Sequence, residues 1–187
     1  MSDTDPTTDL DTAPVHKRHK GPYIVVGIAL IAALILIAVP LVVNVVQGIP
    51  YRYQGDHFSV SFPGKPTVAP NTDAQHFVRW QGGKTSLSVQ SHSLGGEVPG
   101  GDVDAYLTQA LTSGSSALGG KVTEAIHPIT VGGEHALSVT FGTGGSDSVR
   151  EVAFVHDGTF YALILSNASA EQDRAFLSSF AFAKKNL

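Results

Sequence analysis

The chain has 187 residues, with 12 Lys/Arg against 16 Asp/Glu and a formal net charge of −4. It contains no cysteine, which excludes disulfide bonds, a cysteine-ligated zinc site and lipid attachment at a cysteine. From residue 50 onward there are nine Lys/Arg and twelve Asp/Glu, and the basic residues form no stripe, which argues against a nucleic-acid partner.

Residues 1–20 are predicted to form a disordered cytoplasmic tail that ends in a basic juxtamembrane cluster. The first 15 residues are rich in Asp, Ser and Thr and nearly free of apolar side chains. Such a segment cannot bury enough surface to offset the entropy lost on ordering. Lys17, Arg18 and Lys20 then precede a long apolar run. Because Lys and Arg favour the cytoplasmic side of a membrane, this cluster places the N-terminus in the cytoplasm.

Residues 21–47 are predicted to be a single transmembrane signal-anchor helix. The run from Tyr23 to Val46 has no charged side chain and exceeds the ~20 residues that cross a bilayer. Pro40 lacks an amide hydrogen and is predicted to kink the helix, while Asn44 lies near its outer end. The alternative is a cleaved secretory signal, but its apolar core is only ~7–15 residues long. We therefore expect a single-pass plasma-membrane protein whose C-terminal part is extracytoplasmic.

A linker over 48–56 is predicted to lead into an extracytoplasmic domain over 57–187. Alternating polar and apolar side chains in the first segment of this domain are typical of a half-buried strand. Two-residue segments that contain glycine and permit tight hairpins, such as Gly82-Gly83 and Asp157-Gly158, lie between later strands. The predicted strands are 57–62, 74–81, 84–92, 121–131, 134–141, 148–156 and 159–166.

Two helices are predicted between and after these strands. Asp102 is a plausible N-cap for a helix that ends by Gly119-Gly120, and Ser169 with Gln172 forms a capping box for the last helix. Residues 160–165 are apolar on both faces, which indicates a central strand covered above and below. The sequence thus predicts an α+β domain: an antiparallel sheet of about seven strands with two packed helices.

Two short motifs and the order of elements resemble the PsbP/Mog1-like superfamily. The motifs are Phe58-Ser59-Val60-Ser61-Phe62-Pro63 and Phe176-Leu177-Ser178-Ser179-Phe180-Ala181-Phe182. The resemblance covers roughly residues 53–183 and extends to the small membrane-anchored or lipoprotein versions in bacterial envelopes, although this chain lacks the cysteine of the lipoproteins. It implies a sheet with helices on its faces and a non-catalytic adaptor or assembly role.

Motifs that would indicate chemistry are nearly absent. The outer histidines are dispersed without HxH or HExxH spacing, although neighbouring strands can bring a pair together. Asp102-Val103-Asp104 is a DxD pattern, but acids are favoured at a helix start, so we interpret it as capping. The sequence contains no GxSxG elbow. We therefore predict no catalytic residues, no cofactor and no metal site.

Three aromatic residues are predicted to contact a partner or the membrane. Tyr51 and Tyr53 follow the apolar run and match the position of an interfacial aromatic belt. Trp80 lies beside a hairpin turn, where it either covers the end of the sheet or anchors a protein partner.

Three functions are compatible with the sequence. The first is a membrane-anchored, non-catalytic module of the cell envelope that binds or assembles an envelope protein. The second is a binder of a small apolar ligand or lipid, held between helix and sheet with Gly95–Gly101 and Gly142–Asp147 at the mouth. The third is an envelope hydrolase. The sequence favours the first and leaves the oligomeric state open.

Overall fold

The computed structural model describes residues 50–70 and 75–183. The predicted tail and membrane helix, with Lys17, Arg18, Lys20, Pro40 and Asn44, lie outside these residues. Within the described ranges, no helix has the length and apolar character needed to cross a membrane.

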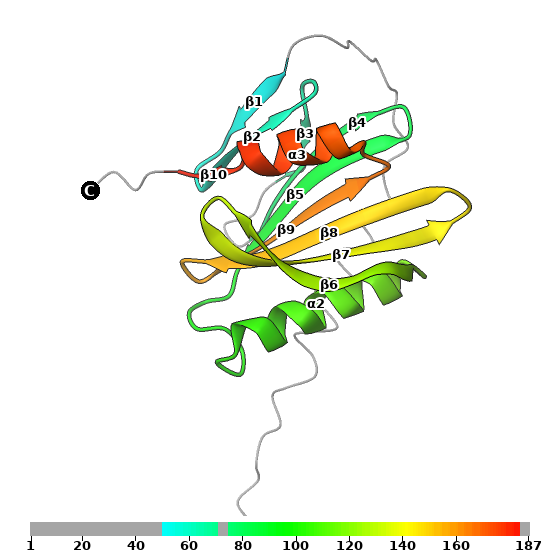
Figure 1. Cartoon of the computed structure of the whole chain (residues 1–187). Coiled ribbons are helices and arrows are strands. Elements are labelled where there is room, and N and C mark those ends of the chain that lie inside the picture. The colour runs from blue at the N-terminus through cyan, green and yellow to red at the C-terminus, as the bar shows by residue number, and fades with distance from the viewer. Residues whose placement is uncertain (1–49, 71–74, 184–187) are drawn as a thin grey trace, which may run out of the picture.

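Two antiparallel sheets and two helices form the domain (Figure 1). The large sheet has, in spatial order, β3 (Thr67–Val68), β4 (Gln75–Gly82), β5 (Thr85–Ser93), β9 (Thr159–Ser166), β8 (Asp147–His156), β7 (Glu134–Gly144) and β6 (Lys121–Val131). The small sheet has β1 (Tyr51–Gln54), β2 (Phe58–Phe62) and β10 (Ala181–Phe182), with β2 in the middle. The helices are α2 (Val103–Ala117) and α3 (Ala170–Ser179).

The large sheet is covered on both faces. Side chains of β2 and α3 pack on one face in a cluster that includes Phe62, Phe154 and Phe176, and α2 packs on the other face through Leu107 and Leu111. Strand β9 contributes to both clusters because its residues alternate between the two faces. This arrangement confirms the predicted α+β fold and the predicted central strand.

Local signals in the sequence place the helix starts correctly. Asp102 accepts a hydrogen bond from the Ala105 amide at 3.0 Å, and Ser169 and Gln172 form the expected capping box. In the β8–β9 hairpin, Phe154 lies opposite Tyr161 and their rings stack with centroids 5.2 Å apart.

The small sheet corrects the predicted single sheet. The segment 57–62 was expected to join the other strands, but β2 pairs instead with β1 and β10. Strand β1 occupies residues 51–54, within the predicted linker over 48–56. Three strands, β1, β3 and β10, have four residues or fewer, which is too short to show the alternation of polar and apolar side chains that identifies a strand. These segments are strands because of the neighbours with which they pair.

Gly120 provides a test of packing under α2. A Cβ atom at this position would lie 2.2 Å from Cδ2 of Phe141, whose side chain is fully buried. We expect Gly120→Ala to lower the free energy of unfolding by about 1–3 kcal/mol, because overpacking displaces a core ring. Urea denaturation followed by the fluorescence of the single tryptophan measures this. Gly142→Ala is the control, since its nearest neighbour, the Asp147 carbonyl oxygen, lies 3.6 Å away; equal losses in the two variants would contradict the expectation.

Candidate functional site

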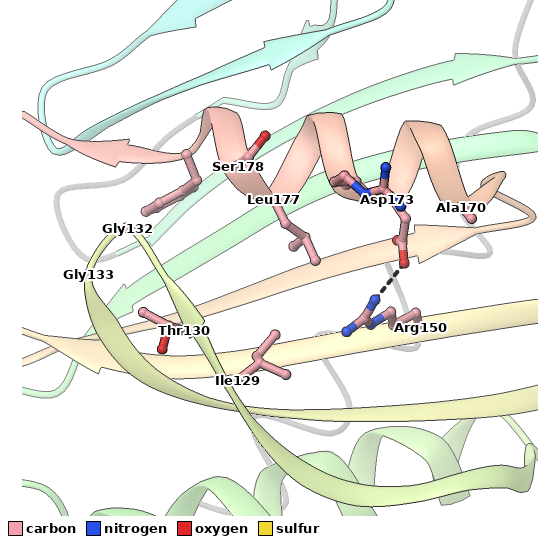
Figure 2. A pocket seen from close by; sticks show the side chains of 11 residues that line it. Ile129, Thr130, Gly132, Gly133, Arg150, Ala170, Asp173, Leu177 and Ser178 are labelled. Atoms are coloured by element: carbon pink, nitrogen blue, oxygen red, sulfur yellow. Dashed lines mark hydrogen bonds and ion pairs between the residues drawn. The ribbon is translucent and has the colours of Figure 1, made fainter.

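A groove runs between α3 and the β6–β7 hairpin, with Arg150 of β8 in its lining (Figure 2). Its volume is about 710 Å³, within the range typical of ligand sites. Leu177 of α3 and Ile129 of β6 point into it from opposite sides, and the turn residues Gly132 and Gly133 lie at one end. The other lining residues are Thr130, Arg150, Ala170, Asp173, Arg174, Ser178 and Phe180. We call this surface the α3 groove.

An ion pair lies in the floor of the α3 groove. Nη1 of Arg150 donates to Oδ2 of Asp173 at 2.6 Å, and the same guanidinium donates through Nε to Ser138 at 2.9 Å. The side chains of Arg150 and Asp173 are 26% and 18% exposed, so the pair is shielded from solvent but not sealed. Oδ1 of Asp173 is buried and has no hydrogen-bond partner among the described residues. The pair fixes α3 to β8.

Removing the carboxylate from this pair is expected to destabilise the domain. Asp173→Ala leaves the Arg150 guanidinium without its anion, and a polar group that loses its partner in a shielded place costs about 1–3 kcal/mol. Partial exposure keeps the effect below that of a fully buried pair. Arg174→Ala, an exposed neighbour on the same helix, should change the free energy of unfolding by less than about 0.5 kcal/mol. Chemical denaturation of both variants checks this, and equal effects would contradict it.

The sequence did not identify the α3 groove. The glycine-rich segments Gly95–Gly101 and Gly142–Asp147, expected at the mouth of a cleft, do not line it. Arg150 and Asp173 are separated by 23 residues and come together only because α3 lies over the face of the large sheet to which β8 directs Arg150 (Figure 2). An arginine in a mostly apolar strand was the available signal, since such a residue needs a partner once the strand is covered.

The three aromatic residues predicted as contacts occupy different environments. Tyr51 is 41% exposed at the start of β1. Tyr53 is partly buried and its ring lies 5.5 Å from that of Phe58. Trp80 also packs on the core beneath the small sheet, and its ring lies against Gly64 and Gly82. None of the three lines the α3 groove.

Glu151 is a buried acid on the opposite face of the sheet. It lies next to Arg150 on β8 but points toward α2, and a Cβ atom on Gly114 would lie 2.7 Å from its Oε2. Burial raises the pKa of Glu151 to about 8. The glycine in α2 therefore makes room for a carboxyl group whose protonated form is favoured by burial.

Histidines pair with acids at the end of the domain near the β8–β9 turn. Nε2 of His135 lies 2.9 Å from Asp104 of α2, and Nδ1 of His156 lies 2.8 Å from Glu134. The His156 ring also stacks on Phe182 at 3.7 Å, which fastens β10 to the large sheet. Within the described ranges, no three His, Asp or Glu side chains are grouped as a metal site would require.

Comparisons with known proteins support the fold. No family model matches the chain, and no curated protein matches its sequence. The solution structure of the cyanobacterial PsbP protein CyanoP from Synechocystis sp. PCC 6803 matches with a TM-score of 0.51 and 14% identity, over 77% of this chain and 99% of that one. A crystal structure from Bacteroides thetaiotaomicron VPI-5482 matches with a TM-score of 0.46 and 11% identity, over 75% of this chain. This chain spans about half the length of the Bacteroides protein, 50%.

The domain therefore has a PsbP-like fold, as its two motifs predicted. The motifs meet in space: the first forms β2, and the second forms the end of α3 and β10. The rings of Phe62 and Phe176 are 5.3 Å apart, and those of Phe58 and Phe180 stack at 5.5 Å.

Proposed function

We propose that this PsbP-like domain is a non-catalytic binding or assembly module of the bacterial cell envelope, and that the α3 groove binds a segment of a protein partner. The observation that carries the proposal is the composition of the groove: apolar side chains on both walls around a shielded ion pair, beside an exposed arginine. The fold comparison is consistent with a binding role, although fold alone does not define function.

An extended peptide fits this groove better than a lipid does. A site for an apolar molecule buries its ligand among apolar side chains, with few polar groups. The α3 groove instead contains Arg150, Asp173 and Arg174, which would lose hydration against a lipid chain. Strand β6, which lines the groove, is the edge strand of the large sheet, so its outer backbone groups are available to pair with an added strand. Leu177 and Ile129 would then hold apolar side chains of the partner.

The proposed location follows from the residues before β1. The charge-free run over 21–47 acts as the anchor, the basic cluster keeps the tail in the cytoplasm, and the domain lies on the outer side of the plasma membrane. In this proposal the helix is the contact with the lipid bilayer, and the domain presents the α3 groove to an envelope protein.

Site-directed photo-crosslinking in native membranes tests the groove. A photoreactive residue at Ser178, exposed on α3, should capture one reproducible partner, whereas the same residue at Gln109, exposed on α2, should not. Arg174→Glu should reduce the yield from position 178, because it reverses the charge at the groove. Equal capture at both positions, or a yield unchanged by the charge reversal, would count against the α3 groove as the binding site. Native mass spectrometry that finds a bound lipid would favour the apolar-ligand alternative.

A further inference from the structure

The start of β1 lies close to the predicted end of the membrane helix. Residues 48–50 separate the proposed anchor, which ends at 47, from Tyr51. Four residue steps span at most ~14 Å even when fully extended. If the helix ends at the edge of the hydrocarbon, the first residue of β1 lies within or next to the headgroup layer.

Strand directions bring several other segments to the same end of the domain. Tyr51 pairs with Phe62, so β2 finishes where β1 begins, and the β2–β3 connection starts there. The Trp80 ring lies against Gly64 of that connection and Gly82 of the β4–β5 hairpin, which joins the two sheets at this end. The β4–β5 hairpin, the β7–β8 turn and the start of β6 all lie toward the right of Figure 1. We call this the proximal end, and the opposite end of the strands the distal end.

Exposed charges differ between the two ends. At the proximal end, Lys65, Lys84 and Lys121 are exposed in the β2–β3 connection, the β4–β5 hairpin and the start of β6. Acids at this end are Asp147, which accepts a hydrogen bond from Asn167, Glu171, and Glu124, which lies near Lys121 on β6. The described acids at the distal end are Asp56, Glu97, Asp102, Asp104, Glu134 and Asp157. No Lys or Arg accompanies them among the described residues of the distal loops and strand ends, and in the sequence Lys184 and Lys185 follow β10 outside the described residues.

Two exposed apolar side chains lie at the proximal end: Tyr51 is 41% exposed, and Val122, next to Lys121, is 50% exposed. Val68, between the ends, and Val103, at the distal end, are the other large apolar side chains exposed among the described residues. Lysines beside exposed aromatic and aliphatic groups are typical of surfaces that contact the membrane interface. The acidic distal end would be repelled from the same surface.

We infer that the proximal end binds anionic lipid headgroups, so that the domain stands on the membrane with its strands roughly along the membrane normal and its acidic end outward. The inference rests on the proposed anchor but adds a second, electrostatic contact that fixes the orientation. The α3 groove, which extends to Gly132 and Phe180 at the distal end, then remains open to a partner.

The sequence contains no cysteine, so a single introduced cysteine can carry a probe that reports the orientation of the domain. A spin label is attached to Lys84→Cys at the proximal end or, as the control, to Glu97→Cys in an exposed distal loop. The full chain is reconstituted in vesicles of phosphatidylcholine with phosphatidylglycerol and a nickel-chelating lipid. The nickel ions at the vesicle surface speed the relaxation of a nearby spin label, and this effect falls steeply with the distance between label and surface. The label at 84 should therefore relax several-fold faster than the label at 97. The difference should shrink in high salt and in vesicles without phosphatidylglycerol.

Equal relaxation at the two positions in chains that remain in the vesicles would overturn the inference and leave the proposed anchor intact. Faster relaxation at position 97 would overturn it as well. If the chain floats free of the vesicles, both the anchor and the inference are wrong. In a second variant, Lys65→Glu with Lys121→Glu should reduce relaxation at position 84, and unchanged relaxation would contradict the role of the lysines.

Discussion

The variant Glu151→Gln is expected to be more stable than the parent chain at pH 8 and about equally stable at pH 4. The carboxyl group of Glu151 is buried between β8 and α2, where burial raises its pKa from 4.5 to about 8. Glutamine has nearly the same shape and no charge to bury. The difference between the two chains therefore reports the cost of ionising this one group inside the fold.

The direction of the pH dependence follows from proton binding. Between pH 4.5 and about 8 the unfolded chain ionises Glu151 while the folded chain keeps it protonated, so the folded state binds more protons and loses stability as pH rises. Below this window both states are protonated, and above it both are ionised. At about 1.4 kcal/mol per unit of pKa, the total loss is on the order of 5 kcal/mol.

Urea denaturation at pH 4, 6 and 8, followed by Trp80 fluorescence, measures this effect. The parent chain should lose free energy of unfolding across the series relative to Glu151→Gln. Glu97→Gln, an exposed acid in a distal loop, is the matched control and should leave the pH dependence unchanged. A constant difference between the parent and Glu151→Gln at all three values would show that Glu151 ionises freely in the folded chain.

Phe154→Ala is expected to cost about 3–5 kcal/mol, a large fraction of the stability of a small domain. The side chain is fully buried, stacks on Tyr161 at 5.2 Å and meets Phe180 edge-on at 5.3 Å. Its ring also lies 6.0 Å from that of Phe182, so it joins the large sheet to the segment after α3. Truncation therefore leaves a cavity at the point where the two sheets are joined.

The midpoint of thermal or urea unfolding measures the effect of Phe154→Ala. Val122→Ala is the control, because that side chain is 50% exposed and its truncation should change stability by less than about 0.5 kcal/mol. Phe154→Leu, which retains most of the buried volume, should cost less than the alanine variant. Equal losses for the leucine and alanine variants would show that the ring contacts, rather than the cavity, determine the effect.

Most of the fold could be predicted because its elements carry local signals. The turns at Gly82-Gly83 and Asp157-Gly158 join strands that are neighbours in sequence, and caps at Asp102 and Ser169 mark the helix starts. The small sheet could not be predicted in this way. Strand β10 has two residues and pairs with β2 across more than a hundred positions, so no short-range pattern indicates the pairing.

The α3 groove was harder to predict from the sequence than the fold. The α3 groove depends on how the β6–β7 hairpin faces α3, which no periodicity reports. Arg150 and Glu151 are adjacent, yet β8 directs the first toward α3 and the second toward α2. In the sequence, two adjacent charged residues suggest a strand with one face open to solvent. Because both faces of the sheet are covered, Arg150 instead forms a shielded ion pair and Glu151 is a buried acid.

The pairing of Ser59 with Ala181 also affects how the domain is made. Strand β2 lies between β1 and β10, and its core contacts include Phe176 and Phe180, which are synthesised more than a hundred residues after it. Contacts so distant in sequence form late, because the chain between them must be brought together first. A ribosome-bound intermediate that ends before residue 176 should therefore leave β2 without its β10 partner and without its aromatic contacts to α3, and sensitive to protease. Native resistance should arise only after residues 176–182 have left the exit tunnel.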